Sequence, residues 1–337
     1  MSTLNERHTL AEQVAQAMGK SVYNNVEAHK DITPRLELQQ KSPKLMTLEE
    51  AIRHSGLKDG MTISFHHHFR GGDKVVNMVV AKLAEMGFKG LHLAASSLQD
   101  VHEPLIEHIR NGVITEISTS GLRGELAKEI SHGLMEKPVV FRSHGGRGEA
   151  IASGELHIDV AFLGASSSDP LGNACGYSRS ENAKSICGSL GYALPDAHYA
   201  DKVVILTDDL VPYPNTPNSI SEHDVDYVVE VESVGDSSKI ASGAIRDTKN
   251  PRDILLAQQA AKVIVNSGYF KNGFSIQTGS GGASLAAVKY IRQSMIDQDI
   301  KASFALGGIT AHMVKMHEEG LIERLIDVQS FDKVAAE

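Results

Sequence analysis

Two glycine-rich stretches combine backbone donors with polar side chains and are the best candidates for chemistry. They are HHHFRGGD (66–73) and TGSGGAS (278–284), each between an apolar run and a helical pattern. A glycine turn at a helix start presents N–H groups and the positive end of the helix dipole, which suits phosphate, carboxylate or a developing oxyanion. Neither stretch matches the P-loop motif or the dinucleotide-binding fingerprint G-x-G-x-x-G. In the second stretch Ser284 occupies the position of the last glycine of that fingerprint. The alternative for each is a tight turn that allows close helix–strand packing.

The histidine triplet at 66–68 suggests either a metal site or an anion site. In an extended segment alternate side chains point to opposite faces, so His66 and His68 share a face and His67 diverges. Zinc needs a third protein ligand, and none follows at a familiar spacing. Because Arg70 can pair bidentately with carboxylate, we expect an anion pocket without metal. The predicted substrate-binding residues here are His66, His68, Arg70, Gly71 and Gly72.

RSHGGRGE (142–149) repeats this chemistry in what we expect to be a flexible loop between a strand and a helix. Its Arg142, His144 and Arg147 are predicted to bind substrate, and a solvated basic turn is the equal alternative.

A third loop, GASSSDPLGN (164–173), follows the buried run IDVAFLG (158–164). Ligand sites of α/β proteins form at the carboxyl ends of parallel strands, so Ser166, Ser167 and Asn173 are predicted to bind substrate. The alternative is that the polar side chains of this loop satisfy only their own backbone.

The loops described above must be positioned by the elements between which they lie. These elements are short apolar runs that alternate with amphipathic helices. Continuous apolar runs are typical of buried strands in a parallel sheet, so the fold class is α/β. The expected strands are 61–65, 91–95, 113–118, 138–141, 158–164 and 202–207. Expected helices are 73–86 and 253–267, with a short one after the capping box of Thr47 and Glu50.

The second glycine loop belongs to a unit that resembles the first. Gly60-MTISF leads to Gly71-Gly72 and a helix, and Gly273-FSIQT leads to Gly281-Gly282 and a helix over 283–296. We interpret this as internal duplication, although chance similarity remains the alternative. The predicted parts are an N-terminal extension (1–45), a first domain (46–248) and a second, incomplete domain (249–337), the chain being either truncated or small in its second half.

The composition favours a soluble globular protein over a nucleic-acid or membrane protein. The 337 residues carry a net charge of −9, whereas phosphate backbones require clustered Lys and Arg. No apolar run approaches the ~20 residues of a membrane span, and the N-terminus does not resemble a signal peptide. Cys175 and Cys187 form no metal or redox motif and are expected to be buried thiols in the cytoplasm.

Longer motifs resemble a known family. GELHIDVAFLGASSSDPLGNACG (154–176) and GFSIQTGSGGASLAAV (273–288) resemble the CoA-transferases. SFHHHFRGGDKVVNMVVAKLAEMG, with FRSHGGRGEAI, is similar to the α subunit of citrate lyase within that superfamily. The resemblance covers nearly the whole chain. It implies two similar open, mostly parallel-sheet domains, and because members are longer, it implies that the second domain is truncated.

The resemblance also implies a reaction and partners. Citrate displaces acetate from an acetyl thioester on an acyl-carrier protein, giving a citryl thioester. The carrier group resembles dephospho-CoA with an added phosphoribosyl unit, so that group or acyl-CoA is a substrate and no cofactor is bound permanently. The implied partners are the β subunit, the γ acyl-carrier subunit and further copies of the chain in a cytoplasmic homo-oligomer.

One departure from the family concerns the nucleophile. Related enzymes that form a glutamyl-CoA intermediate carry the Glu in a segment resembling G-[IV]-[HT]-[SA]-E-M, and LGGITAHM (306–313) aligns His312 with it. We therefore expect the carboxylate of citrate to attack the thioester directly, with His312 either orienting it or serving structurally. Gly281 and Gly282 are predicted to be catalytic through their backbone, and Ser280 to bind substrate.

Two alternatives remain open at the level of sequence. One is a CoA-transferase for another carboxylic acid, although the His66–Arg70 segment argues against it. The other is a non-catalytic scaffold fragment that folds and binds partners without turnover.

Overall fold

The computed structural model describes residues 12–18, 44–181, 183–240, 248–279 and 281–337. The chain divides into two compact units, Met1–Lys41 and Ser42–Glu337. In the first unit residues 12–17 are helical, and the rest of the predicted extension up to residue 43 lies outside the described ranges. The remaining description concerns the second unit.

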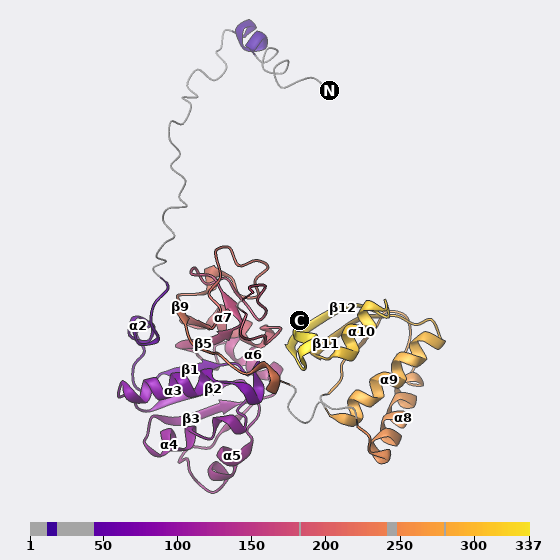
Figure 1. Cartoon of the computed structure of the whole chain (residues 1–337), viewed down its shortest axis with the longest axis horizontal. Coiled ribbons are helices and arrows are strands. Elements are labelled where there is room, and N and C mark those ends of the chain that lie inside the picture. The colour runs from indigo at the N-terminus through magenta and orange to yellow at the C-terminus, as the bar shows by residue number, and fades with distance from the viewer. Residues whose placement is uncertain (1–11, 19–43, 182, 241–247, 280) are drawn as a thin grey trace. The chain divides into compact units, whose positions relative to one another are not determined.

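A seven-stranded parallel sheet is built in the order β4-β3-β2-β1-β5-β8-β9 (Figure 1). Its strands are β1 (Thr62–Phe65), β2 (Leu91–Ala95), β3 (Ile114–Thr119), β4 (Val140–Phe141), β5 (Val160–Ala165), β8 (Lys202–Thr207) and β9 (Tyr227–Glu230). All six strands expected from the apolar runs are present, with no end shifted by more than two residues. The very short strands β6 (Ser167–Ser168) and β7 (Ala174–Cys175) pair antiparallel in the loop after β5.

Helices cover both faces of this sheet. α3 packs on α4 and α4 on α5 on one face, whereas α6 packs on α7 on the other. This follows because right-handed crossovers that move across the sheet in opposite directions place their helices on opposite faces. The helices are α2 (Leu48–His54), α3 (Val75–Glu85), α4 (Leu105–Arg110), α5 (Gly124–Ser131), α6 (His144–Ala152) and α7 (Leu194–Tyr199). The 3-10 turns are η2 (Arg70–Gly72), η3 (Asp100–His102), η4 (Gly191–Ala193), η5 (Glu222–Asp224) and η6 (Ser237–Lys239).

A second, three-stranded parallel sheet has the order β10-β11-β12. Its elements are α8 (Pro251–Val265), β10 (Phe274–Ile276), α9 (Gly282–Asp297), β11 (Ala302–Ile309), α10 (Ala311–Glu318), β12 (Ile322–Ser330) and α11 (Lys333–Ala336). The series β10-α9-β11-α10-β12 runs through the same strand order as β1-α3-β2-α4-β3. Each sheet has its own apolar core.

Local signals in the sequence explain several element starts. The predicted capping box is present, since Thr47 Oγ1 accepts from the Glu50 backbone and Glu50 bonds back to Thr47. The expectation of a flexible loop over 142–149 is wrong, because Ser143 Oγ caps Gly146 N at 3.0 Å and α6 begins at His144. Cys187 is buried as expected, whereas Cys175 is half-buried.

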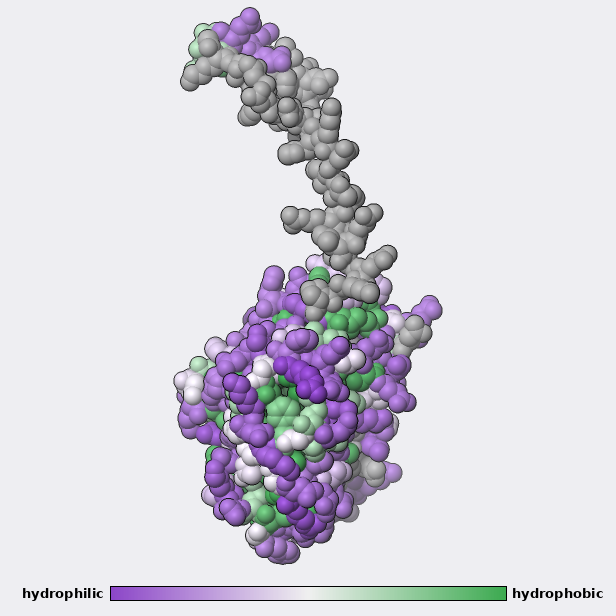
Figure 2. All heavy atoms as spheres, turned by 90° about the vertical axis from the view of Figure 1, so that its left-hand side faces the viewer, coloured by the Kyte–Doolittle hydropathy of each residue, from purple (hydrophilic) through white to green (hydrophobic). Residues whose placement is uncertain are grey.

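Within the ranges that the structure describes, every helix is too short or too polar to cross a bilayer. Figure 2 shows one face of the molecule, on which hydrophilic residues predominate and hydrophobic ones gather only in small areas.

Candidate functional site

The site lies at the topological switch point of the large parallel sheet, between β1 and β5. β1 pairs with β2 on one side and with β5 on the other, and the connections leave β1 and β5 in opposite directions. In doubly wound sheets the crevice beyond the carboxyl ends of such strands receives ligands. The 66–73 loop follows β1, and the 166–173 loop follows β5, so both predicted loops belong to this end of the sheet.

His66 and His68 share a face, as alternation predicts. Their ring centroids lie 3.9 Å apart, and both side chains are buried. The carbonyl groups of Gly164 and Val328 are nearby, yet no ring nitrogen of either histidine makes a hydrogen bond of normal geometry. Four buried nitrogens without a partner are costly, so the pair is prepared to bind a polar ligand.

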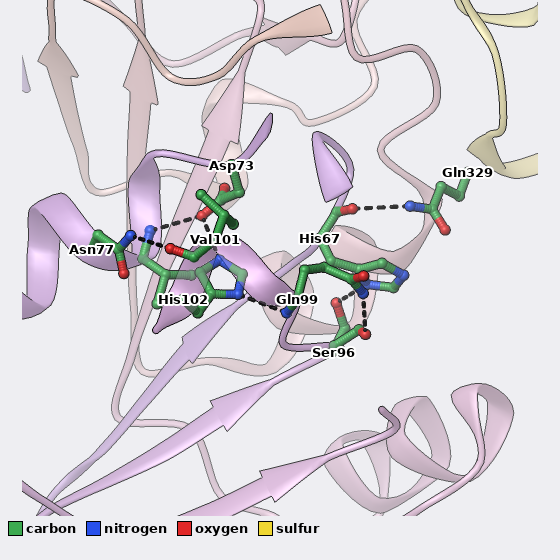
Figure 3. Close-up of polar contacts among 10 residues, drawn as sticks. His67, Asp73, Asn77, Ser96, Gln99, Val101, His102 and Gln329 are labelled. Atoms are coloured by element: carbon green, nitrogen blue, oxygen red, sulfur yellow. Dashed lines mark hydrogen bonds and ion pairs between the residues drawn. The ribbon is translucent and has the colours of Figure 1, made fainter. Parts of the chain in front are cut away.

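His67 diverges from its neighbours and joins three segments of the chain (Figure 3). Its Nδ1 lies 2.5 Å from Ser96 Oγ at the end of β2, and its carbonyl accepts from Gln329 Nε2 at 2.9 Å. The ring stacks near His144 and Tyr192, with centroids 5.4 and 5.5 Å away. The triplet therefore connects the large sheet to the end of β12.

Arg70 is held in an unusual conformation. Its φ of 51° lies in the left-handed region, which is uncommon for residues other than glycine. The guanidinium lies over the Phe331 ring at 5.0 Å, and its buried Nη1 has no hydrogen-bond partner. Phe331 can occupy this place because residue 308 is glycine. A Cβ atom at that position would lie 2.1 Å from the Phe331 ring. An arginine held this way is positioned for a carboxylate.

Burial and neighbouring charges lower the pKa of the imidazoles at this site, so the rings are neutral when no anion is bound. Burial lowers the pKa of His66 to about 4, although Asp73 and Asp196 oppose this. Burial, together with neighbouring cationic groups, holds the pKa of His67 well below its ordinary value. Burial also lowers the pKa of His144, and Arg147 and Arg70 lower it further. A bound anion would reverse these shifts by favouring the protonated rings.

Arg147 is close to the site but serves the protein itself. It donates to both oxygens of Asp196 at 2.7 and 2.9 Å, to Ser64 Oγ and to the Ala94 carbonyl. Its terminal nitrogens are therefore used to hold β1, β2 and α7 together. These contacts favour a positioning role for Arg147 over the predicted contact with substrate, which stays a prediction.

Arg142 and His144 lie at the start of α6. Arg142 pairs with Glu155 through one nitrogen at 2.9 Å, and its buried Nη1 has no hydrogen bond. The exposed His144 lies at the first position of α6, with its ring 4.9 Å from that of Tyr192. The structure thus brings His144 to the triplet, with its ring 5.4 Å from that of His67, whereas Arg142 lies beside Glu155.

The loop after β5 satisfies its own polar groups. Ser166 Oγ accepts from Cys187 N, and Ser167 Oγ donates to the Tyr177 carbonyl. Asn173 donates to Asp169 and to Glu222. These contacts agree with the alternative of a self-satisfied turn, and the partners outside the loop lie in the segment 177–222.

The two glycines near the end of the 66–73 loop differ in role. A Cβ at Gly72 would lie 2.2 Å from the Asp236 carbonyl, so this close approach needs glycine. A Cβ at Gly71 would meet nothing closer than 3.8 Å. Gly72 is therefore required for packing, which was the alternative for this pair.

The second glycine loop begins α9, with Gly281 at the N-cap and Gly282 as the first helical residue. Ser280 lies outside the described residues. His312 is the second residue of α10, half-buried, after β11. The 66–73 loop contacts the small sheet through Gln329, which donates to the His67 carbonyl, and through Phe331, whose ring lies against Arg70.

Sequence reasoning missed several residues that build the site. Asp73 caps Val76 and accepts from His102 Nε2 at 3.1 Å, while the Gln99 backbone donates to His102 Nδ1 (Figure 3). Asp196, Tyr192, Gln329 and Phe331 come from distant segments, and no local pattern marks them. For Asp73 a signal existed, since an aspartate just before an apolar helix is a common cap.

The part of the chain described here contains one group of three metal-type side chains, His157, Asp159 and Asp201. It lies at the amino ends of β5 and β8, away from the triplet. The fold thus defines a doubly wound α/β protein, with buried basic residues at the switch point as a candidate anion site.

Comparison with known proteins specifies the family. A family model described as citrate lyase, alpha subunit (CitF) matches residues 42–337, so the chain belongs to the citrate lyase alpha subunit family. It is 59% identical over 319 residues to the citrate lyase alpha chain of Haemophilus influenzae, covering 94% of this chain and 62% of that one. It is 61% identical over 290 residues to that of Escherichia coli, covering 86% and 56%.

A solved structure is also similar. It comes from Streptococcus mutans and is described provisionally as the alpha subunit of citrate lyase in complex with citrate. The TM-score is 0.83 at 57% identity, covering 91% of this chain and 58% of that one. This chain spans between 56% and 62% of the length of the two curated relatives named above.

Proposed function

We propose that this chain acts as the transferase subunit of citrate lyase, exchanging citrate for acetate on an acyl-carrier thioester. The observation that carries this is the buried, unpartnered set of His66, His68 and Arg70 at the end of β1. Such a set suits a polycarboxylate, because each carboxylate can take donors that the protein leaves unused. The family membership and a relative with bound citrate support the same ligand.

In the proposed reaction a citrate carboxylate oxygen bonds to the acetyl carbonyl carbon as the C–S bond breaks, which gives a mixed anhydride and a thiolate. The thiolate then attacks the citryl carbonyl and acetate leaves, so no atom is gained or lost. Arg70 and the two histidines orient citrate, and the Gly281–Gly282 amides stabilise the oxyanion. His312, in place of a glutamate nucleophile, orients the attacking carboxylate.

The proposed co-substrate is an acetyl thioester of the phosphoribosyl-dephospho-CoA carrier group or of CoA. The proposed partners are the β subunit, the γ acyl-carrier subunit and further copies of this chain in the cytoplasm. We also propose that the two sheets are duplicated CoA-transferase-like domains, 46–248 and 249–337, the second one incomplete. The shared strand order supports this duplication.

A transfer assay tests the function. The protein is incubated with acetyl-CoA and citrate, and acetate and citryl thioester are quantified by chromatography. We expect both products in equal amounts. Turnover only with other carboxylic acids would favour a different CoA-transferase, and a folded protein with no turnover would favour the scaffold fragment.

A further inference from the structure

Arg70 is a buried cation whose charged neighbour is a second cation. Burial lowers the pKa of its guanidinium, and Arg123 lowers that pKa further, whereas no carboxylate in the described part of the chain acts in the opposite direction. The Nη1 atom of Arg70 also lacks a hydrogen-bond partner. Since a buried charge without a partner is costly, this arrangement is stable only when an anion completes it.

Arg123 belongs to the loop after β3, and β3 is two strands away from β1 in the large sheet. The three strands are in register at their carboxyl ends, because Phe65 pairs with Ala95 and Ala95 pairs with Thr119. Strands that are two apart lie about 10 Å from each other. A ligand with several acidic groups can span the space between two arginine side chains that extend from such loops.

The turns that carry the two arginines are packed on one 3-10 helix, η3. Asp73, directly after η2, accepts a hydrogen bond from His102 of η3 at 3.1 Å (Figure 3). The start of α5 lies against the same helix, since a Cβ at Gly124 would be 2.6 Å from the Asp100 carboxylate. The backbone beside each arginine is therefore fixed relative to the other before a ligand binds.

Arg123 is exposed, and the acids on its own helix are used by other cations. Glu125 pairs with Lys128 at 2.8 Å, and Glu129 pairs with Arg110 at 2.8 Å. Over the ranges that the structure covers, Arg123 itself makes no ion pair. Two cations without acids thus occupy one end of the sheet, although the net charge of the chain is −9. Such a local excess of positive charge attracts a multiply charged anion.

We infer that Arg123 binds a second carboxylate of the acid substrate while Arg70 binds the first, so that the site selects a polycarboxylate over a monocarboxylate. This inference rests on the proposed function, which supplies the acid. Each guanidinium can offer paired donors to one carboxylate. Acetate has a single carboxylate and can engage only one of the two arginines, so the product acid leaves more readily than citrate does.

Isothermal calorimetry with citrate tests this inference on the 337-residue chain. Arg123→Gln should weaken citrate binding by at least about fivefold, because the hydrogen bonds to a charged group are lost. Arg123→Lys should recover only part of the affinity, since lysine keeps the charge and not the paired donors. Lys128→Gln is the matched control. It removes an exposed cation from the same helix and should bind citrate within about twofold of the wild type.

The outcomes separate this inference from the proposed function. Equal citrate affinity of the wild type and a folded Arg123→Gln protein would overturn the inference and leave the proposed function intact. An equal loss in Lys128→Gln would also overturn it, because general attraction would then replace contact. CoA binding provides a further arm. If Arg123→Gln weakens only CoA binding, the arginine binds a phosphate of the thioester substrate and the inference fails. A wild-type protein that binds no citrate would overturn the proposed function and the inference together.

Discussion

Arg147 and Asp196 form a buried ion pair whose charges both act on His66. Their side chains are 4% and 0% exposed, and two hydrogen bonds of 2.7 and 2.9 Å join them. The same guanidinium reaches Ser64 in β1 and the Ala94 carbonyl in β2. The pair therefore links four elements next to the site, namely α6, α7, β1 and β2.

Removing one partner of this pair should destabilise the fold. Arg147→Met leaves Asp196 as an uncompensated buried charge, which costs about 3–5 kcal/mol. Urea unfolding should show this loss, and Arg147→Met with Asp196→Leu should recover a large part of it. A stable Arg147→Met protein that has lost only citrate binding would contradict the positioning role and restore the substrate-binding prediction.

Gly72 and Gly71 offer a matched pair of substitutions. Gly72→Ala places a Cβ against the Asp236 carbonyl, and overpacking of this kind costs about 1–3 kcal/mol. Gly71→Ala has open space and should change the free energy of unfolding by less than about 0.5 kcal/mol. Equal midpoints in thermal unfolding for the two variants would show that the close approach is not what selects glycine.

The buried His66 should make the protein less stable in mild acid. Its folded pKa of about 4 lies below the ordinary 6.5, so the unfolded chain binds more protons between these values and stability falls as the pH falls. Between pH 7 and pH 5 this contributes about 2 kcal/mol. Urea unfolding of the wild type and of His66→Gln at both pH values checks it, and the variant should lose that part of the pH dependence. Parallel pH profiles would argue against a buried neutral ring.

The absence of a glutamate at position 312 predicts that the reaction proceeds without an acyl-enzyme. Acetyl-CoA with hydroxylamine or borohydride should leave no covalent adduct on the wild type, and mass spectrometry of the intact protein measures this. His312→Glu introduces the carboxylate that related enzymes use and serves as the comparison. An adduct on the wild type would refute direct attack by citrate.

The sequence predicts the framework of this protein better than its site. Strands such as Leu91–Ala95 are found correctly because continuous apolar runs report burial directly. The pairing of Arg147 with Asp196 is not predictable, since the residues are 49 positions apart and only the tertiary fold brings them together. For the same reason the contact of Gln329 with His67 was missed. Ser143 was a local signal for the start of a helix. The glycines that follow it in α6 favoured the interpretation as a loop, so the helix was missed.

Citrate titration tests the central claim most directly. Isothermal calorimetry should detect binding to the wild type, and Arg70→Gln should weaken it ten- to a hundredfold, about 1.5–3 kcal/mol for hydrogen bonds to a charged group. Arg110→Gln removes an exposed arginine that pairs with Glu107 and Glu129, and should bind as the wild type does. Unchanged citrate affinity in a folded Arg70→Gln protein would contradict an anion site at the end of β1.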